Sequence, residues 1–463
     1  MTLLITEPDV DAREQRAGFV RSSLPAEGLF AGKSWRVSPE PFAVDRQLGK
    51  RLEGLGVALH RFVCAANKLY LDSAAGREPR WIADYLDIGK PKELIEYARN
   101  GSPAKELPRV IRPDLILTDN DFAITELDSV PGGIGLTAWL NETYSKLGYQ
   151  VIGGPGGMLA GFRAIAESAD ILVSDECGDY QPEMEWLARR IDEEFGSGGG
   201  RVCRAESYEP ATAQPADEGG KRRRRTVYRF FELFDLPNIP PAQALMRAES
   251  AGELAVTPPF KPHLEEKAWL ALFWMRPLRE FWLRELGGRN LRLLQQVIPY
   301  TWIIDPTPLP HNASFPRLEA QSWADVAALS QRERYLVVKI SGFHQDAWGS
   351  RSVVMGSDVS QRDWAATIEE SVADFGNSPR VLQAFHKGRL FEQRYFSEED
   401  QRIKHMTGRV RLCPYYFVAA GRVELAGVLA TICPADKKLI HGMQDAILVP
   451  VAVTPPQRSQ EVN

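Results

Sequence analysis

The chain has 463 residues, of which 44% are hydrophobic and 25% are charged, a composition typical of a globular protein with more than one packed domain. Its formal net charge is −5 and both signs are spread along the chain, so it lacks the general basic surface that nucleic acids or anionic membranes attract. The N-terminal stretch MTLLITEPDVDAREQRAG carries carboxylates where a signal peptide needs a basic and then an apolar segment, and no apolar run is long enough to cross a membrane. We therefore expect a cytoplasmic protein that binds neither nucleic acid nor membrane.

Residues 1–105 are predicted to form a mainly helical N-terminal region. Apolar residues recur at helical spacing from Asp45 to Ala75, which indicates one long amphipathic helix. The segment from Pro79 to Asn100 indicates further short helices that break at Pro91.

A hairpin of two strands is predicted next, at the start of a second region that covers residues 106–330. The stretch RPDLILTDNDFAITELD alternates in hydrophobicity on both sides of a loop from Thr118 to Phe122. An antiparallel register around that loop predicts three opposed pairs, which are Ile116 with Ile124, Asp114 with Glu126, and Arg112 with Asp128.

This register gathers an arginine and three carboxylates on one face of the hairpin. Opposed carboxylates repel by about 4 kcal/mol at ~4 Å and an effective dielectric near 20, so the face is unfavourable unless a positive group lies on it. Oxygen ligands without His or Cys favour Mg²⁺, which completes its shell with phosphate oxygens and water. The pattern alone also fits an exposed hairpin whose charges face solvent. The glycines that follow, in PGGIG from Pro131, suit the close approach of a ligand or mark a simple turn.

The rest of this second region is predicted to be α/β. The stretch that begins VIGGPGG alternates a glycine-rich entry, a helix, a strand and another helix. Residues 196–225 are rich in Gly, Pro and charge and are predicted to form a flexible loop with one short strand near Val202. A Trp-rich helical stretch from Leu264 to Leu286 is expected to kink at Pro277 and to end before Gly287.

Strands dominate the third region, residues 331–455, and a short tail covers residues 456–463. Lys339 ends an apolar strand, where burial is costly without an anionic partner, and Gly342 and Gly349 lie in the loop that follows. A strand lysine beside a glycine loop is typical of a phosphate clamp, although the same pattern is often only structural. Gln383 lies at the end of another short strand, where backbone groups could read an adenine edge.

Taken in order, these motifs resemble the circularly permuted ATP-grasp ligases, in particular the synthetase domain of glutathionylspermidine synthase. The resemblance is carried by R112-P-D114, E126-L-D128, the helix start E266-K267-A268, the strand ending VVK339, and VLQAF around Gln383. It implies an α/β (α+β) fold of the circularly permuted ATP-grasp type, in which residues 106–330 hold the metal hairpin and residues 331–455 bind the nucleotide.

The resemblance also implies a reaction and a role for each residue. The family is an ATP- and Mg-dependent carboxylate–amine ligase that works through an acyl phosphate, so the expected partners are a small-molecule or peptide carboxylate and an amine; no oligomeric state is predicted. Asp114, Glu126 and Asp128 inherit the metal, and Arg112 inherits the transferred phosphoryl group without serving as the carboxylates' salt-bridge partner. The remaining family positions are expected to bind ATP, and they are Lys267, Lys339, Gly342, Gly349 and Gln383. The flap from Ser341 to Ser350 is expected to close over the nucleotide.

Several departures keep other functions open. The flap lacks the family's Gly-Arg-x-Gly, and the segment G427-V-L-A-T lacks an arginine that the family often carries. These changes favour a degenerate ATP-grasp protein that binds nucleotide in a regulatory or scaffold role. A third hypothesis is an unrelated α/β protein that binds a sugar nucleotide or dinucleotide on the VIGGPGG loop, although this loop is not a GxGxxG motif.

Overall fold

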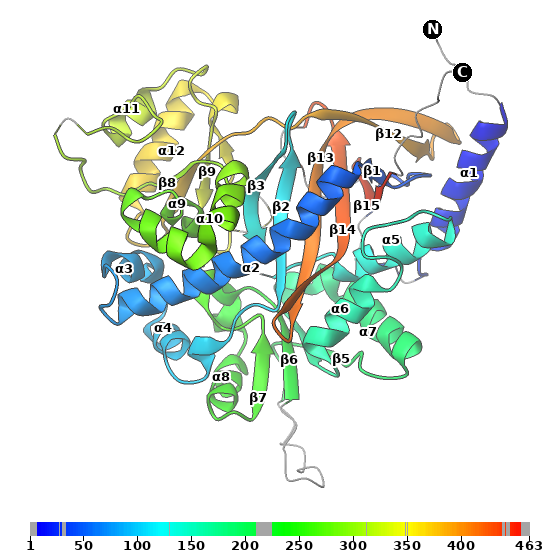
Figure 1. Cartoon of the computed structure of the whole chain (residues 1–463), viewed down its shortest axis with the longest axis horizontal. Helices are drawn as coiled ribbons and strands as arrows, with labels where there is room; N and C mark the ends of the chain where they lie inside the picture. Colours follow the sequence, from blue (N-terminus) through cyan, green and yellow to red (C-terminus); the bar gives the residue numbers. More distant parts are fainter. Residues whose placement is uncertain are drawn as a thin grey trace.

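The computed structural model describes residues 7–26, 28–29, 34–128, 130–209, 225–311, 313–347, 349, 351–437, 440 and 445–454. In this part the chain forms three β-sheets with helices packed on them (Figure 1). The α-helices are α1 (Glu7–Ser22), α2 (Arg46–Ala74), α3 (Trp81–Asp87), α4 (Lys92–Arg99), α5 (Ile134–Lys146), α6 (Gly157–Ala166), α7 (Gln181–Phe195), α8 (Ala242–Ser250), α9 (Ala268–Leu272), α10 (Arg279–Val297), α11 (Trp323–Ala328) and α12 (Gln361–Ala373). Short 3₁₀ turns are η1 (Pro103–Lys105), η2 (Asp175–Tyr180), η3 (Leu233–Asn238), η4 (Pro262–Leu264), η5 (Arg276–Leu278) and η6 (Gly356–Asp358).

The N-terminal region is mainly helical, as predicted. The side chain of Asp45 caps α2 by accepting a 2.7 Å hydrogen bond from the backbone N–H of Leu48. The apolar stripe of α2, which includes Leu52, Leu59 and Phe62, is buried, and the helix lies across the central sheet (Figure 1). The predicted break at Pro91 is confirmed.

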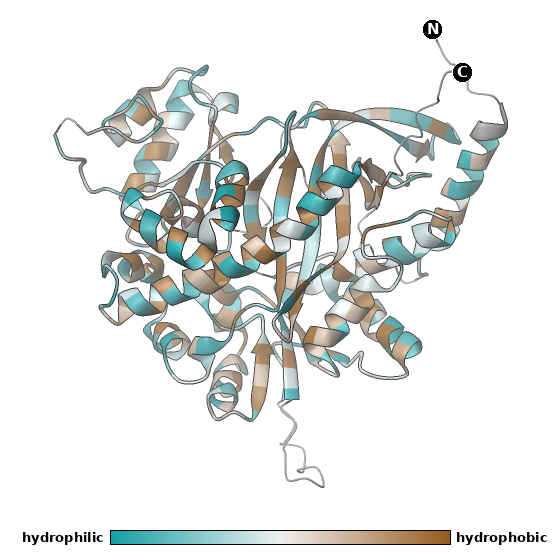
Figure 2. Ribbon diagram, viewed as in Figure 1, coloured by the Kyte–Doolittle hydropathy of each residue, from teal (hydrophilic) through white to brown (hydrophobic). Residues whose placement is uncertain are grey.

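The central sheet has seven strands and contains the predicted hairpin. Its order is β1-β15-β14-β13-β2-β3, with β12 also paired to β13. All neighbours are antiparallel except β1 and β15. Figure 2 shows hydrophobic residues concentrated along these strands. The bounds are β1 (Phe42–Val44), β2 (Val110–Leu117), β3 (Phe122–Asp128), β12 (Leu390–Ser397), β13 (Arg402–Ala419), β14 (Arg422–Pro434) and β15 (Ile447–Val453).

The register of the hairpin β2–β3 matches the prediction at its charged end. Arg112 pairs with Asp128 and Asp114 with Glu126. The third predicted pair is wrong, because a bulge shifts the register after Asp114 and brings Leu115 opposite Ile124. The bulge leaves Thr125 as the extra residue on β3.

A second sheet carries the predicted lysine strand. Its order is β10-β9-β11-β8, all antiparallel, with bounds β8 (Thr301–Ile303), β9 (Leu336–Ile340), β10 (Val354–Met355) and β11 (Arg380–Ala384). Trp364 and Ile368 of α12 join Val338 and Leu382 in one apolar core. The second sheet therefore holds Lys339 on β9 beside Gln383 on β11.

The third sheet is parallel and belongs to the predicted α/β segment. Its order is β5-β4-β6-β7, with bounds β4 (Asp170–Val173), β5 (Arg201–Arg204), β6 (Arg225–Phe230) and β7 (Leu254–Thr257). The short strand expected near Val202 is β5. Residues 210–224 of the expected flexible loop lie outside the described residues, as does the tail at 456–463.

The Trp-rich stretch is interrupted at both predicted places. The chain does break at Pro277, which lies in η5 between α9 and α10. The helix also ends before Gly287, as predicted, because Gly287 has non-helical backbone angles (φ 71°, ψ 156°) that kink α10, and a second helical stretch then continues to Val297.

The three sheets do not follow the expected division of the chain by residue range. The hairpin β2–β3, in the expected region 106–330, belongs to the same sheet as β12 to β15 in the expected region 331–455. Likewise β8, from the earlier region, pairs with β11 of the later one. The two regions therefore build their sheets jointly, and this brings the hairpin and the lysine strand to one cavity.

Candidate functional site

A cavity of about 470 Å³ lies between the hairpin and the second sheet. Its charged lining is dominated by cations, with five Lys or Arg side chains against two carboxylates: Arg332, Lys339, Lys387, Arg409, Arg411, Asp114 and Glu126. Most of the remaining lining is apolar and includes Val337, Met355 and Phe385, with a few uncharged polar side chains such as Gln383 and Ser357. An apolar slot joined to a cationic end fits a ligand with a flat apolar part and an anionic part.

Asp114 is the most enclosed charge at this cavity, with a side chain only 2% exposed. Its Oδ1 lies 3.1 Å from NH2 of Arg112, and its Oδ2 accepts a 2.9 Å hydrogen bond from NH1 of Arg411 on β13. The thiol of Cys413 donates to Oδ1 at 3.3 Å. Burial pushes the pKa of Asp114 up, but Arg112 and Arg411 outweigh it and hold that pKa below its ordinary value. Asp114 is therefore ionised near neutral pH.

Arg112 is a salt-bridge partner of these carboxylates, contrary to the prediction. Besides Asp114 it forms an ion pair with Asp128, and its NH1 donates to the carbonyl of Gly132 at 3.1 Å. Burial raises the pKa of Asp128, and the nearby carboxylates add to that rise. Neither Arg112 nor Asp128 lines the cavity.

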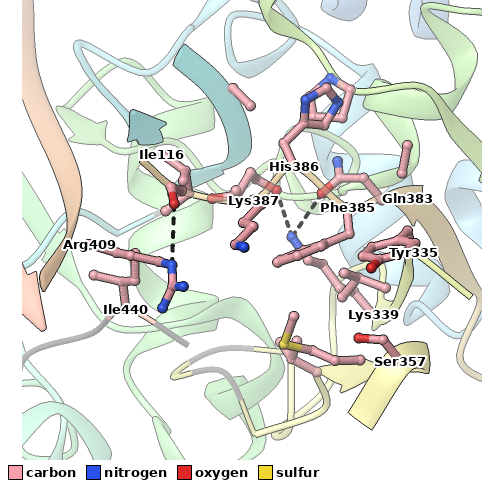
Figure 3. Close-up of a pocket in the computed structure, with 18 of the residues that line it drawn as sticks. Ile116, Tyr335, Lys339, Ser357, Gln383, Phe385, His386, Lys387, Arg409 and Ile440 are labelled. Carbon is pink, nitrogen blue, oxygen red and sulfur yellow. Dashed lines mark hydrogen bonds between the residues drawn. The ribbon is translucent and has the colours of Figure 1, made fainter. Parts of the chain in front are cut away.

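Lys339 is held in the wall of the cavity by two acceptors. Its Nζ donates to the backbone carbonyl of Thr125 at 2.9 Å and to Oε1 of Gln383 at 3.0 Å, as Figure 3 shows for Gln383. The bulge in β3 explains the first contact, because the extra residue Thr125 leaves the regular ladder. Burial lowers the pKa of Lys339 to about 8, although Glu126 opposes the change.

Gln383 supports Lys339 through its side chain. Its Nε2 donates to Oγ1 of Thr301 at 3.3 Å, and the hydroxyl of Thr301 donates in turn to the carbonyl of Pro299 at 2.9 Å. This chain of donors fixes the amide so that Oε1 faces the lysine. The backbone N–H groups of Ala384 and Phe385 already donate to carbonyls of Tyr300 and Tyr335, so they are not free to read a base.

Lys267 lies behind the carboxylates and not in the cavity lining. Its Nζ is 3.6 Å from Oε2 of Glu126 and donates to the carbonyl of Ala347, in the expected flap, at 2.8 Å. Gly342 and Gly349 also lie outside the cavity lining. A Cβ on Gly342 would come within 2.5 Å of the carbonyl of Glu265, so this glycine serves close packing. Trp348 and Ser350 of the expected flap lie outside the described residues.

The glycine segment after Asp128 is occupied by the protein itself. A Cβ on Gly132 would lie 2.4 Å from the ring of Tyr180, and one on Gly133 would lie 2.7 Å from the hydroxyl of Tyr415. The buried carboxylate of Glu183 accepts from the backbone N–H of Gly133 at 2.8 Å. The close approach that these glycines permit is therefore made by neighbouring side chains.

The cavity thus unites Asp114, Glu126, Lys339 and Gln383 of the predicted site. Sequence reasoning missed Arg409 and Arg411, which alternate along β13 in the stretch RVRLC and both line the cavity. Arg409 donates to the carbonyl of Gly388 at 3.2 Å (Figure 3). Arg409 and Arg411 are two residues apart on a strand, so the sequence alone could have indicated that both side chains lie on one face of it.

The oxygen donors fit a divalent cation in part. Within the described ranges no group of three His, Cys, Asp or Glu side chains is placed to hold a metal ion. Asp114 and Glu126 are directly opposed and both line the cavity, and Mg²⁺ needs only one or two carboxylates when phosphates complete its shell. The donor set therefore fits Mg²⁺ with these two carboxylates, whereas Asp128 does not line the cavity.

The architecture is that of the ATP-grasp fold, with the carboxylate hairpin ahead of the lysine strand in the chain. No family model matches the sequence, and no curated protein matches it either. Among solved structures, the chain is similar to a glutathione synthetase-like effector from Globodera pallida in its apo form. That likeness has a TM-score of 0.54 and 11% identity, and covers 97% of this chain and 98% of the other.

A second solved structure, a candidate γ-glutamylcysteine synthetase from Methylobacillus flagellatus, matches with a TM-score of 0.37 and 13% identity over 87% of each chain. At that score it adds nothing to the assignment. The fold class predicted from the motifs is confirmed by the sheets and by the first likeness. Among the helices that the structure describes, none combines the length and apolar character that a membrane span needs.

Proposed function

We propose that this protein is an ATP- and Mg-dependent carboxylate–amine ligase that works through an acyl phosphate. The observation that carries the proposal is the cavity in which the buried cation of Lys339 faces the opposed carboxylates Asp114 and Glu126, beside an apolar slot. The ATP-grasp fold supports it, because this fold places a nucleotide between two sheets. The resemblance of the motif order to the ligase family supports the same reaction.

The roles follow from the charges at the cavity. The apolar slot near Val337, Met355 and Phe385 would take the base, and Lys339 would hold phosphate oxygens as a point charge. Asp114 and Glu126 would hold Mg²⁺, which when bound offsets negative charge on the phosphates. Lys267 forms an ion pair with Glu126 and donates to the carbonyl of Ala347 in the flap, so it would couple the position of the flap to that of Glu126.

In the proposed reaction, a carboxylate oxygen of the acid attacks the γ-phosphorus of ATP, and the bond to the bridging oxygen breaks to release ADP. The amine nitrogen then attacks the acyl carbon, phosphate leaves, and the nitrogen loses a proton. Such transfers need positioning and charge neutralisation more than covalent help from the protein. A dry cavity would also protect the acyl phosphate from water.

The first test is binding. Purified protein should bind ATP in the presence of Mg²⁺, measured by isothermal titration calorimetry, and Lys339→Ala or Asp114→Ala should abolish that binding. Retained affinity in both folded variants would refute the site. The second test is turnover, in which ADP release is followed while candidate acids and amines are supplied in pairs.

A degenerate ATP-grasp protein that only binds nucleotide is the second candidate, and two contacts favour it. Arg112 is already paired with Asp114 and Asp128, and Gly342 is packed against Glu265 where the family has a mobile glycine loop. This candidate predicts ATP binding without ADP release for any acid and amine. Turnover with one pair would exclude it.

A further inference from the structure

Arg411 is the cation that the structure adds to the predicted site. It lies on β13, pairs with Asp114 through NH1 at 2.9 Å, and lines the cavity with a side chain 19% exposed. Its other neighbouring charges include Arg112 and Glu126. It therefore stands among the carboxylates that are proposed to hold Mg²⁺.

Within the part of the chain that the structure describes, most donors of Arg411 have no acceptor. A guanidinium carries five N–H donors. To the residues that the structure describes, Arg411 makes its one hydrogen bond from NH1, and its Nε is buried without a partner. Arg409, two residues earlier, is different, because it donates to backbone carbonyls of Gly388, Ala435 and Lys437. Arg409 thus has a structural role through its bonds to the backbone, whereas Arg411 has N–H donors that remain available to a ligand.

The position of Arg411 is fixed from behind. Asp114 is nearly fully buried, and the thiol of Cys413 donates to its Oδ1 while Arg411 occupies Oδ2. An ion pair of this kind is weak support for the fold, because a well-packed apolar pair often does as well.

The strand beside Arg411 carries a buried polar side chain at the paired position. Thr431 on β14 pairs with Arg411 in the β13–β14 register, is fully buried, and its hydroxyl oxygen has no partner within the described chain. Thr431 also ends the segment G427-V-L-A-T, which lacks an arginine. Arg411 therefore puts a guanidinium on the same part of the sheet from the strand beside it.

We propose that Arg411 contacts the terminal phosphates of the nucleotide, with Asp114 and Cys413 as its positioning residues. The inference rests on the proposed nucleotide function and deepens it. Planar guanidinium groups match phosphate oxygens in pairs, which a lysine does not. Asp114 then has two roles: its Oδ2 orients Arg411, and its carboxylate lines the cavity in which it would help to hold Mg²⁺.

The test compares affinities for ATP, ADP and adenosine by calorimetry, in the presence of Mg²⁺ and without turnover. Arg411→Met should weaken ATP binding by about 10- to 100-fold, because charge-assisted hydrogen bonds are lost. Adenosine binding should be unchanged, because adenosine carries no phosphate. Arg411→Lys should lose less, since it keeps the charge but not the fork. The matched control is Arg422→Met, which replaces an exposed arginine on β14, the strand paired with β13, and this variant should bind ATP like the parent.

The outcomes separate this inference from the proposed function. A parent protein that binds no ATP overturns both. A parent that binds ATP, with folded Arg411→Met and Arg411→Lys variants of the same affinity, overturns only the role of Arg411. If Arg411→Met fails to fold, Arg411→Lys carries the comparison alone, and equal affinities for ATP in that variant and the parent count against the role. An equal loss for ATP and adenosine also contradicts it, because that pattern reports a general distortion of the cavity.

Discussion

Asp114→Asn isolates the central carboxylate of the site while keeping its shape. The substitution removes the negative charge that meets Arg112 at 3.1 Å and Arg411 at 2.9 Å. Arg112 keeps Asp128 and the carbonyl of Gly132, so the main loss falls on Arg411, which has no other ion pair within the described chain.

The magnitude follows from burial. Removing one partner of a buried ion pair costs roughly 3–5 kcal/mol, because the remaining charge is left uncompensated in a poorly solvated place. Arg411 is 19% exposed and retains some hydration, which favours the lower limit. We expect a loss of about 3 kcal/mol, a large share of the ~5–15 kcal/mol that folded proteins possess.

Urea unfolding at neutral pH measures this loss. Glu424→Gln is the matched control, since Glu424 is an exposed carboxylate on β14, and it should change the free energy of unfolding by less than ~0.5 kcal/mol. The double variant Asp114→Asn/Arg411→Met should recover part of the loss, because it removes both charges. A loss in Asp114→Asn no greater than in the control would refute the argument.

The same ion pair has a defined pH dependence. The pKa of Asp114 is lowered in the folded state, so its stabilising effect is present above the unfolded value near 3.9 and is lost as pH falls through the folded pKa. The difference between parent and Asp114→Asn should therefore be constant from about pH 5 to pH 8.

Three further predictions concern the cavity wall and the glycine segment. ATP affinity should fall as pH rises above about 8, the pKa of buried Lys339, and Lys339→Arg should flatten this pH profile in calorimetric titrations. Because the pKa of this lysine is 10.5 in the unfolded chain, its contribution to the free energy of unfolding should rise with pH between about 8 and 10.5. Gln383→Glu puts a carboxylate beside Nζ and should move the midpoint of that profile up by about 1 pH unit or more, whereas Gln383→Met should not raise it. Gly132→Ala should cost about 1–3 kcal/mol in urea unfolding, because its Cβ would lie 2.4 Å from the ring of Tyr180, while Gly178→Ala has open space and should cost far less.

The alternation of charge along the hairpin was sufficient to predict its register at the functional end. Arg112, Asp114, Glu126 and Asp128 are spaced by two within their strands, and only one register opposes them in pairs. The bulge at Thr125 could not be predicted, because nothing in the local pattern requires an extra residue. Its consequence is functional, since the carbonyl of Thr125 receives Lys339 from another sheet.

Contacts between distant parts of the chain account for the remaining differences. Arg411 lies 297 residues after Asp114, and the hairpin shows only that the carboxylates need positive charge, not where it comes from. A metal ion was the natural expectation when the hairpin was considered alone. The structure supplies arginines as well, so the carboxylates are neutralised in part by the protein's own cations. The metal hypothesis accordingly narrows to Asp114 and Glu126, which line the cavity, and Asp128 serves first to hold Arg112.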